Sequence, residues 1–160
     1  KTNEFISINY EMQNVVPETG KLNRAKCDVK DGKTTKISGI IVKKEGNDYY
    51  GALEGTKEYF EIHPKTLTSM NMFGFTPLLF DYINNDIKEF FNKNKDNLLD
   101  VEYSLPKIVN DMIKKDLVIV KSCKTNSKWL GITYREDLEE VKNKIKEKYN
   151  NGEYPNKLFK

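Results

Sequence analysis

The first 62 residues carry a succession of short β-type runs separated by turn signals. These runs cover residues 5–10, 25–29, 34–42, 49–53 and 59–62. Asp31-Gly32 is a strong hairpin signal, and Gly46, Asn47 and Asp48 mark a second turn. Because runs joined by tight turns pair antiparallel, this part of the chain predicts an antiparallel β meander.

The pattern changes after His63-Pro64. Residues 66–75 form an apolar run with little alternation, which favours a strand buried on both faces. Helical periodicity covers 77–91, 104–113 and 136–149, and strands are expected over 117–120 and 128–133. Together with the meander, these segments predict an α/β protein with a mixed sheet and flanking helices.

Composition limits the class of protein. The chain has 160 residues, which suits a single domain over 1–160, and its hydrophobic content of 38% is too high for a disordered chain. No apolar run approaches the roughly 20 residues that span a bilayer, and no secretory signal opens the sequence. Cys27 and Cys123 make no disulfide framework, so we expect reduced thiols and a cytoplasmic protein.

The basic residues are almost all lysines. Only Arg24 and Arg135 are arginines among 27 basic side chains, and the net charge is +3. Nucleic-acid surfaces often recruit arginine for two-pronged contacts to phosphate and guanine. The alternating lysines of 142–148 are interpreted as a solvated helix face, so no nucleic-acid partner is expected.

Self-contained catalytic motifs are missing from the sequence. It has no Gly-rich phosphate loop, no G-x-S-x-G elbow and no D-x-D pair after an apolar strand. The single His63 has no neighbouring cysteine or histidine, which makes it a poor metal ligand. The residues alone therefore predict neither a catalytic residue nor a metal ligand in this chain.

Three stretches carry a resemblance to a known family. They are the run from Ser69 to Pro77, the run from Glu102 to Pro106 followed by Val109-Asn110, and the run from Lys128 to Asp137 followed by Gly152-Glu153-Tyr154-Pro155. In order and spacing they resemble the C-terminal half of bacterial sugar-phosphate nucleotidyltransferases of the glucose-1-phosphate uridylyl/thymidylyltransferase-like family. The resemblance covers nearly the whole chain.

The resemblance implies a partial Rossmann-like fold and a division of labour. Enzymes of this family join an NTP to a sugar 1-phosphate with Mg²⁺ and release pyrophosphate. The chain would be the sugar-binding side of that domain, without the N-terminal NTP-binding part, and it starts without an initiator Met. We therefore expect a fragment that is inactive alone, with Mg²⁺ bound mainly by the missing half and no cofactor held by this chain.

The same resemblance points to four substrate-binding candidates: Asn71, Trp129, Lys128 and Arg24. The amide of Asn71 would bind a sugar hydroxyl or be satisfied by neighbouring backbone, and Lys128 would face a phosphate or solvent. Trp129 matches an aromatic residue that precedes a metal Asp in the family. Gly131 replaces that Asp here, which favours a position in the core or in a pocket wall for Trp129 over a catalytic role.

Other hypotheses stay open beside the enzyme fragment. A Glu–basic pair of the family is absent near Gly39 and Ile40, and Ala25 follows Arg24 where the family has glycine. These departures fit a non-catalytic module that binds a sugar phosphate or a partner protein. A third hypothesis, a lysine-rich nucleic-acid binder, predicts steeply salt-dependent binding. A sheet that has lost its other half would also expose apolar surface, so we expect self-association.

Overall fold

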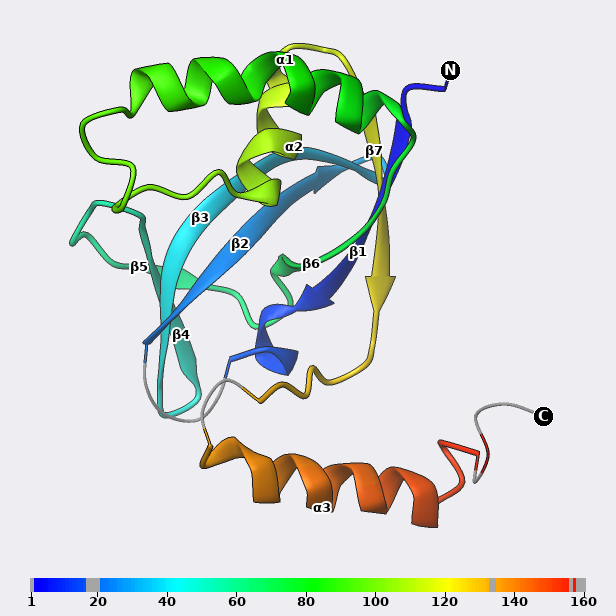
Figure 1. Ribbon diagram of the computed structural model, residues 1–160. Coiled ribbons are helices and arrows are strands. Elements are labelled where there is room, and N and C mark those ends of the chain that lie inside the picture. The colour runs from blue at the N-terminus through cyan, green and yellow to red at the C-terminus, as the bar shows by residue number, and fades with distance from the viewer. Residues whose placement is uncertain (1, 17–20, 133–134, 156, 158–160) are drawn as a thin grey trace. The chain divides into compact units, whose positions relative to one another are not determined.

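The computed structural model describes residues 2–16, 21–132, 135–155 and 157 (Figure 1). The chain divides into two compact units, residues 1–127 and residues 128–160. Each unit is described by itself below.

The first unit is built mainly from strands. These are β1 (Glu4–Glu11), β2 (Lys21–Lys30), β3 (Lys33–Glu45), β4 (Asp48–Leu53), β5 (Phe60–Ile62), β6 (Leu67–Gly74) and β7 (Ile119–Thr125). A 3₁₀ turn (Met12–Asn14) follows β1, and the helices α1 (Leu78–Lys93) and α2 (Leu105–Lys114) lie between β6 and β7 in the chain.

Five of these strands close into a barrel. Neighbours pair in the order β2–β6–β1–β7–β3, and β3 pairs back with β2 along ten residues to complete the circle. The second half of β3 then continues beyond the barrel and carries β4, which in turn pairs with β5. A single long strand therefore belongs both to the barrel and to the sheet that extends from it.

The expected mixed α/β sheet with flanking helices and a partial Rossmann-like fold is wrong. Within the described residues, β1 and β7 are the one parallel pair of neighbours, and all other neighbouring strands run antiparallel. Rossmann-like folds need several parallel strands with helices packed on both faces. A closed, mostly antiparallel barrel does not meet that requirement. The description of the chain as a Rossmann-like nucleotidyltransferase is therefore wrong as well.

The apolar run 66–75 contains β6, and the expectation that this strand is buried on both faces is wrong. Residues of β6 range from buried to exposed along its length. Thr68 and Ser69 are buried whereas Met72 is exposed, and Asn71 has a positive φ of 59°. The register between β6 and β1 shifts at this point, as expected for a β-bulge. The strand is thus an ordinary barrel strand with one irregularity.

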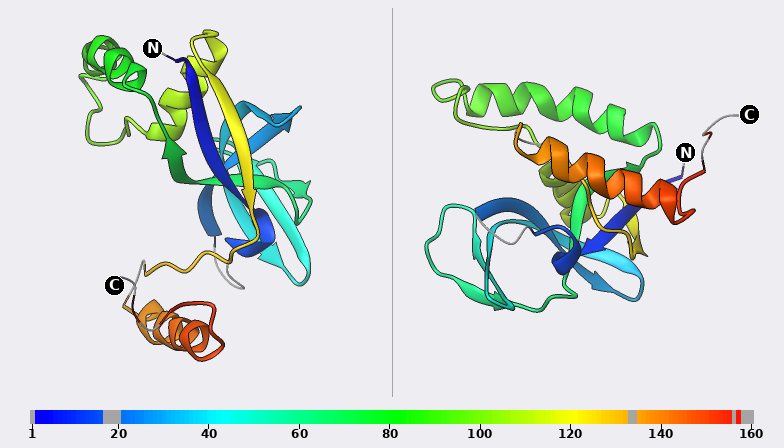
Figure 2. Two further views of the ribbon diagram at one scale, coloured as in Figure 1. Left: turned by 90° about the vertical axis from the view of Figure 1, so that its right-hand side faces the viewer. Right: turned by 90° about the horizontal axis from the view of Figure 1, so that it is seen from below.

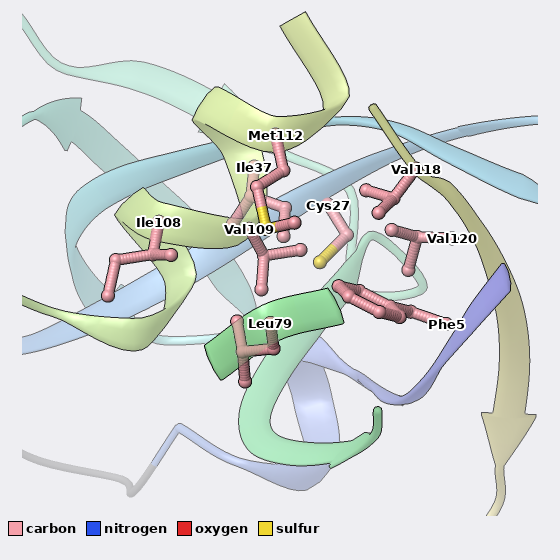
Figure 3. Packing of buried hydrophobic residues seen from close by; sticks show 9 residues of the cluster. All are labelled: Phe5, Cys27, Ile37, Leu79, Ile108, Val109, Met112, Val118 and Val120. Atoms are coloured by element: carbon pink, nitrogen blue, oxygen red, sulfur yellow. The ribbon is translucent and has the colours of Figure 1, made fainter. Parts of the chain in front are cut away.

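The main hydrophobic core lies between the barrel strands and the two helices (Figure 3). Phe5 and Val120 stand side by side in the parallel pair β1–β7, and both are buried. The helix α2 contributes Val109 and Met112 to the same cluster. The full cluster comprises Phe5, Cys27, Ile37, Leu79, Ile108, Val109, Met112, Val118 and Val120. α2 is therefore fastened to the barrel by its apolar face, as its helical periodicity predicts.

A second set of buried side chains supports the outer half of β3. Ile40 and Val42 are fully buried, and Ile62 from β5 is nearly so. The side chain of Ile62 lies so close to Gly51 of β4 that a Cβ on Gly51 would come within 2.3 Å of its Cδ1. The β3–β4–β5 extension therefore has close packing of its own.

The second unit contains the helix α3 (Asp137–Asn150). Its first turn carries the acids Asp137, Glu139 and Glu140, and Lys148 lies in its last turn, as the helix dipole favours. Residues 128–132 form no strand, so the strand expected over 128–133 is wrong in its described part, and residue 133 lies outside the described residues.

Most of the local predictions are confirmed. The helices expected over 77–91, 104–113 and 136–149 occur within two residues of those bounds. The Asp31-Gly32 turn joins β2 to β3 with positive φ at both residues, the geometry of a tight hairpin. Thr76 precedes α1, but its hydroxyl is buried and makes no hydrogen bond, so it does not cap the helix.

Candidate functional site

The four sequence-predicted substrate residues lie in different settings. Arg24 in β2 is half-buried, and its Nε and Nη2 atoms donate to the backbone oxygen of Val15 at 3.2 and 2.7 Å. Burial lowers the pKa of this guanidinium. Asn71 is exposed at the bulge of β6, and its backbone N–H donates to Oγ of Ser69. Arg24 and Asn71 thus belong to two paired barrel strands, β2 and β6.

Lys128 and Trp129 belong to the second unit. Lys128 is exposed and Trp129 half-buried. The indole of Trp129 lies over Gly131, where a Cβ would come within 2.1 Å of the ring. Gly131, which replaces an expected metal ligand, therefore leaves room for the neighbouring indole.

A polar layer crosses the interior of the barrel. Asn9 is fully buried, and its Oδ1 accepts hydrogen bonds from the Ser7 hydroxyl at 2.7 Å and from the Cys27 thiol at 3.6 Å. Its Nδ2 donates to Oγ of Ser122 at 2.8 Å. Burial raises the pKa of Cys27 to about 12, so the thiol stays protonated at neutral pH. This layer joins β1, β2 and β7 and offers no exposed reactive group.

An ion pair stands next to that layer. Glu11 of β1 is almost buried, and its Oε1 lies 2.6 Å from Nζ of Lys124. Gln13 donates a further hydrogen bond to the same carboxylate. These hydrogen bonds lower the pKa of Glu11, with the contact to Lys124 as the largest cause. Glu11 is consequently a carboxylate at neutral pH and is already paired.

The described residues hold no group of three or more histidine, cysteine, aspartate or glutamate side chains that could bind a metal ion. The resemblance assigned Mg²⁺ mainly to residues outside this sequence, and that expectation stays a prediction.

A cluster of lysines and tyrosines stands on the sheet that extends from the barrel. The ammonium of Lys43 in β3 lies 4.6 Å from the ring centroid of Tyr59 and 5.7 Å from that of Tyr50. The ammonium of Lys21 in β2 lies 5.6 Å from the ring of Tyr59. We call Lys21, Lys43, Tyr50 and Tyr59 the lysine–tyrosine cluster. Its members come from β2, β3, β4 and the residue before β5.

Strand register explains how the cluster assembles. Lys21 pairs with Lys43, and Lys43 pairs with Tyr50, so the three side chains stand in one row across three strands. Tyr59 precedes β5 and is more than a third exposed. A positive charge within about 6 Å of an aromatic face is attracted to it. The row therefore presents ammonium groups and tyrosine rings together.

Electrostatics keep this cluster charged. Lys43 forms an ion pair with Glu45, and the hydrogen bond to that carboxylate is the main reason why the pKa of Lys43 is raised. Both tyrosines contribute to the same shift. Lys43 is therefore a cation at neutral pH, held beside two rings and one carboxylate.

The sequence predicted strands at Tyr50 and Tyr59 but left Lys21 and Lys43 outside the expected strands, and it did not connect the four residues. The signal was present for two of them, because the turn predicted at Gly46, Asn47 and Asp48 sets Lys43 opposite Tyr50. Tyr59 follows a loop after β4, and no local pattern places its ring beside Lys43.

No protein-family model matches the chain, and no curated protein matches it. Among the described residues, no helix combines the length and apolar character needed to cross a membrane.

Proposed function

We propose that the first unit binds single-stranded nucleic acid over β2–β5, at the lysine–tyrosine cluster. The observation that carries the proposal is the position of Lys43, whose ammonium lies close to the rings of Tyr50 and Tyr59. Single strands are bound by combining basic groups, which contact phosphates, with aromatic rings, on which bases stack. The cluster supplies both chemistries on neighbouring strands.

A single strand suits this surface better than a duplex. Stacking on a tyrosine needs an unpaired base, whereas direct reading of a duplex usually relies on arginine in the major groove. Arg24 donates to the backbone oxygen of Val15 in the same unit. The scarcity of arginine was the reason for expecting no nucleic-acid partner. A site that binds phosphates through lysine and bases through tyrosine does not need arginine.

Binding is measured by fluorescence anisotropy with labelled single-stranded RNA and DNA of mixed sequence at several salt concentrations. We expect the logarithm of affinity to fall with the logarithm of salt, with a slope of about −0.7 for each phosphate contacted. Losing a stacked base costs about 1–3 kcal/mol, so Tyr59→Ala should weaken binding roughly five- to 150-fold. Lys43→Ala should weaken binding and flatten the salt slope.

Lys115→Ala is the matched control. The ammonium of Lys115 also lies over a tyrosine ring, 5.0 Å from the ring centroid of Tyr82, but Lys115 directly follows α2 and Tyr82 lies in α1, so neither belongs to the strands of the cluster. Its replacement should leave binding unchanged. A further variant tests the role of Glu45, since Glu45→Gln frees Lys43 from its ion pair and should strengthen binding. Equal effects of Lys43→Ala and Lys115→Ala would refute the cluster as the binding site.

The same experiment addresses the sugar-phosphate hypothesis. Unlabelled glucose 1-phosphate and inorganic phosphate are added as competitors. A single phosphate meets the lysines but not the stacking surface, so neither competitor should displace the oligonucleotide at comparable concentration. Displacement by glucose 1-phosphate alone would favour a sugar-phosphate module instead. The Rossmann-like fold expected with a nucleotidyltransferase is wrong, so the fold lends that activity no support.

A further inference from the structure

The outer face of the pair β1–β7 exposes apolar side chains. Ile6 is 43% exposed and Ile119 is 37% exposed, and Met72 of the neighbouring strand β6 is 54% exposed. Figure 2 (left) shows β1 and β7 side by side toward the viewer, and neither α1 nor α2 lies in front of them. Isolated surface hydrophobics are ordinary, but several on adjacent strands mark a surface suited to contact.

The charges on this face follow a definite pattern. The parallel register sets Glu4 beside Ile119 and Ile6 beside Lys121. The four side chains therefore form a block of two by two, with the charged residues on one diagonal and the isoleucines on the other. Nζ of Lys121 lies 3.1 Å from Oε2 of Glu4, and both side chains are about half exposed. We call these four residues the diagonal block.

We propose that the diagonal block is the centre of a homodimer interface, occupied by a second copy of this chain. In this dimer a twofold axis lies between the two facing sheets and runs along the line from Ile6 to Ile119. Rotation about this axis places Glu4 of one copy over the position of Lys121 in the other. Glu4 then meets Lys121 of the partner subunit, and the reverse pair forms by symmetry. Each isoleucine meets its own counterpart on the axis. The block is thus complementary to itself, which an interface with twofold symmetry requires.

The geometry of such a dimer follows from strand dimensions. Strands lie about 4.8 Å apart and rise about 3.3 Å per residue, so the diagonal makes an angle of roughly 36° with the strands. Rotation about that diagonal makes the strands of the two copies cross at roughly 70°, close to the orthogonal class of sheet packing. Two open sheet faces therefore pack in a known arrangement.

Gly74 allows the close approach that this packing needs. It pairs with Ile6 across β6–β1, and the nearest side-chain atom to a Cβ at this position would be Cβ of Ile6, at 3.8 Å. Gly74 itself therefore places no side chain beside Ile6 on this face. The proposal thus gives the self-association expected from the sequence a location, the diagonal block, and a symmetry, a twofold axis.

Sedimentation velocity of the full chain over a range of concentrations tests the proposal. The unmodified protein should form dimers at high concentration. Glu4→Lys and Lys121→Glu each place like charges opposite one another across the axis, and like charges that face each other at an interface cost several kcal/mol. Each variant alone should therefore dimerise at least about tenfold more weakly.

Mixing the two variants gives the decisive result. In the mixture, a copy with two positive charges at the block meets a copy with two negative charges, so both ion pairs form across the interface. Dimers should return, as heterodimers of Glu4→Lys with Lys121→Glu. An ion pair that acts only within one chain is broken in both variants, and mixing cannot restore it. Lys88→Glu, a charge reversal on α1, should leave the dimer unchanged.

Two further results protect the interpretation. Circular dichroism should show that both charge variants are folded, and Ile6→Ser should weaken the dimer without any charge reversal. A monomer at all concentrations for the unmodified protein would overturn the proposal. Folded variants that stay monomeric after mixing, while the unmodified protein dimerises, would also overturn it, because the dimer would then use another surface.

Discussion

The backbone N–H of Ile37 in β3 donates a hydrogen bond to Oδ1 of Asn110 in α2, at 2.8 Å. Ile37 lies between the part of β3 that pairs with β7 and the part that pairs with β4. The side chain of Asn110 therefore takes a place that a neighbouring strand would fill in a continuous sheet. Both residues are buried, so the amide joins the helix to the barrel where water does not compete.

Removing this side chain should destabilise the protein. Asn110→Ala leaves the N–H of Ile37 buried without an acceptor, which typically costs about 1–3 kcal/mol in the free energy of unfolding. Equilibrium urea denaturation measures the loss. Asn84→Ala, an exposed asparagine on α1, is the control and should change stability little. Equal stability of the two variants would show that the Asn110 contact carries no weight.

The contact between Gly51 and Ile62 predicts an effect of added volume. A Cβ on Gly51 would lie 2.3 Å from Cδ1 of Ile62, so Gly51→Ala should destabilise by about 1–3 kcal/mol through overpacking. Gly74→Ala is the control when both variants are measured at concentrations too low for dimerisation, because its Cβ would meet the nearest atom at an ordinary 3.8 Å.

A double variant identifies the cause of that effect. Ile62→Val removes the methyl group that meets the added Cβ, so Gly51→Ala with Ile62→Val should cost less than the sum of the two single changes. Thermal unfolding of the four proteins checks this. Strict additivity would contradict the proposed steric contact.

The ion pair of Glu11 with Lys124 predicts a dependence on pH. The folded protein holds the pKa of Glu11 below its usual value of 4.5, so the folded state binds this proton less readily than the unfolded state. The resulting stabilisation is present above about pH 4.5 and disappears as the pH falls through the folded pKa. Glu11→Gln lacks it at every pH.

The free energy of unfolding of the unmodified protein and of Glu11→Gln should therefore converge as the pH falls from 6 toward 3. Urea denaturation at several pH values measures the difference. Glu89→Gln, a change at an exposed residue of α1, supplies the baseline for removing a carboxylate. A constant difference between Glu11→Gln and the unmodified protein would show that the pKa of Glu11 is the same in both states.

Local chemistry made the single elements predictable. Asp31-Gly32 adopts positive φ at both residues because the two-residue turn of a right-twisted hairpin needs that conformation. The apolar spacing of Ile108, Val109 and Met112 marks the buried face of α2 directly in the sequence. These signals lie within a few residues of one another, and the structure follows them.

The closure of the barrel was not predictable in the same way. It depends on β1 pairing with β7, and the hydrogen bond from Asn9 to Ser122 joins residues 113 positions apart. Nothing local distinguishes β7 as a partner for β1 from a strand in an α/β sheet. The resemblance to nucleotidyltransferases filled that gap with a different topology, and the error in the fold followed from it.

Part of the lysine–tyrosine cluster could be predicted from the sequence. The turn at Gly46 implies the pairing of Lys43 with Tyr50, since strands joined by a tight turn pair outward from it. Tyr59 joins the cluster through the loop after β4, which carries no periodic signal. The diagonal block needs the parallel register of β1 and β7, so no inspection of the sequence alone could assemble it.

The position of β1 between β6 and β7 also governs when the protein can finish folding. On the ribosome β1 must wait until nearly the whole first unit has been made before it can pair with β7, which begins at residue 119. Until then the edge of β1 that will receive β7 stays without its partner, open to pairing with other chains. Such distant pairing slows folding, and the barrel can close only after β7 has been made.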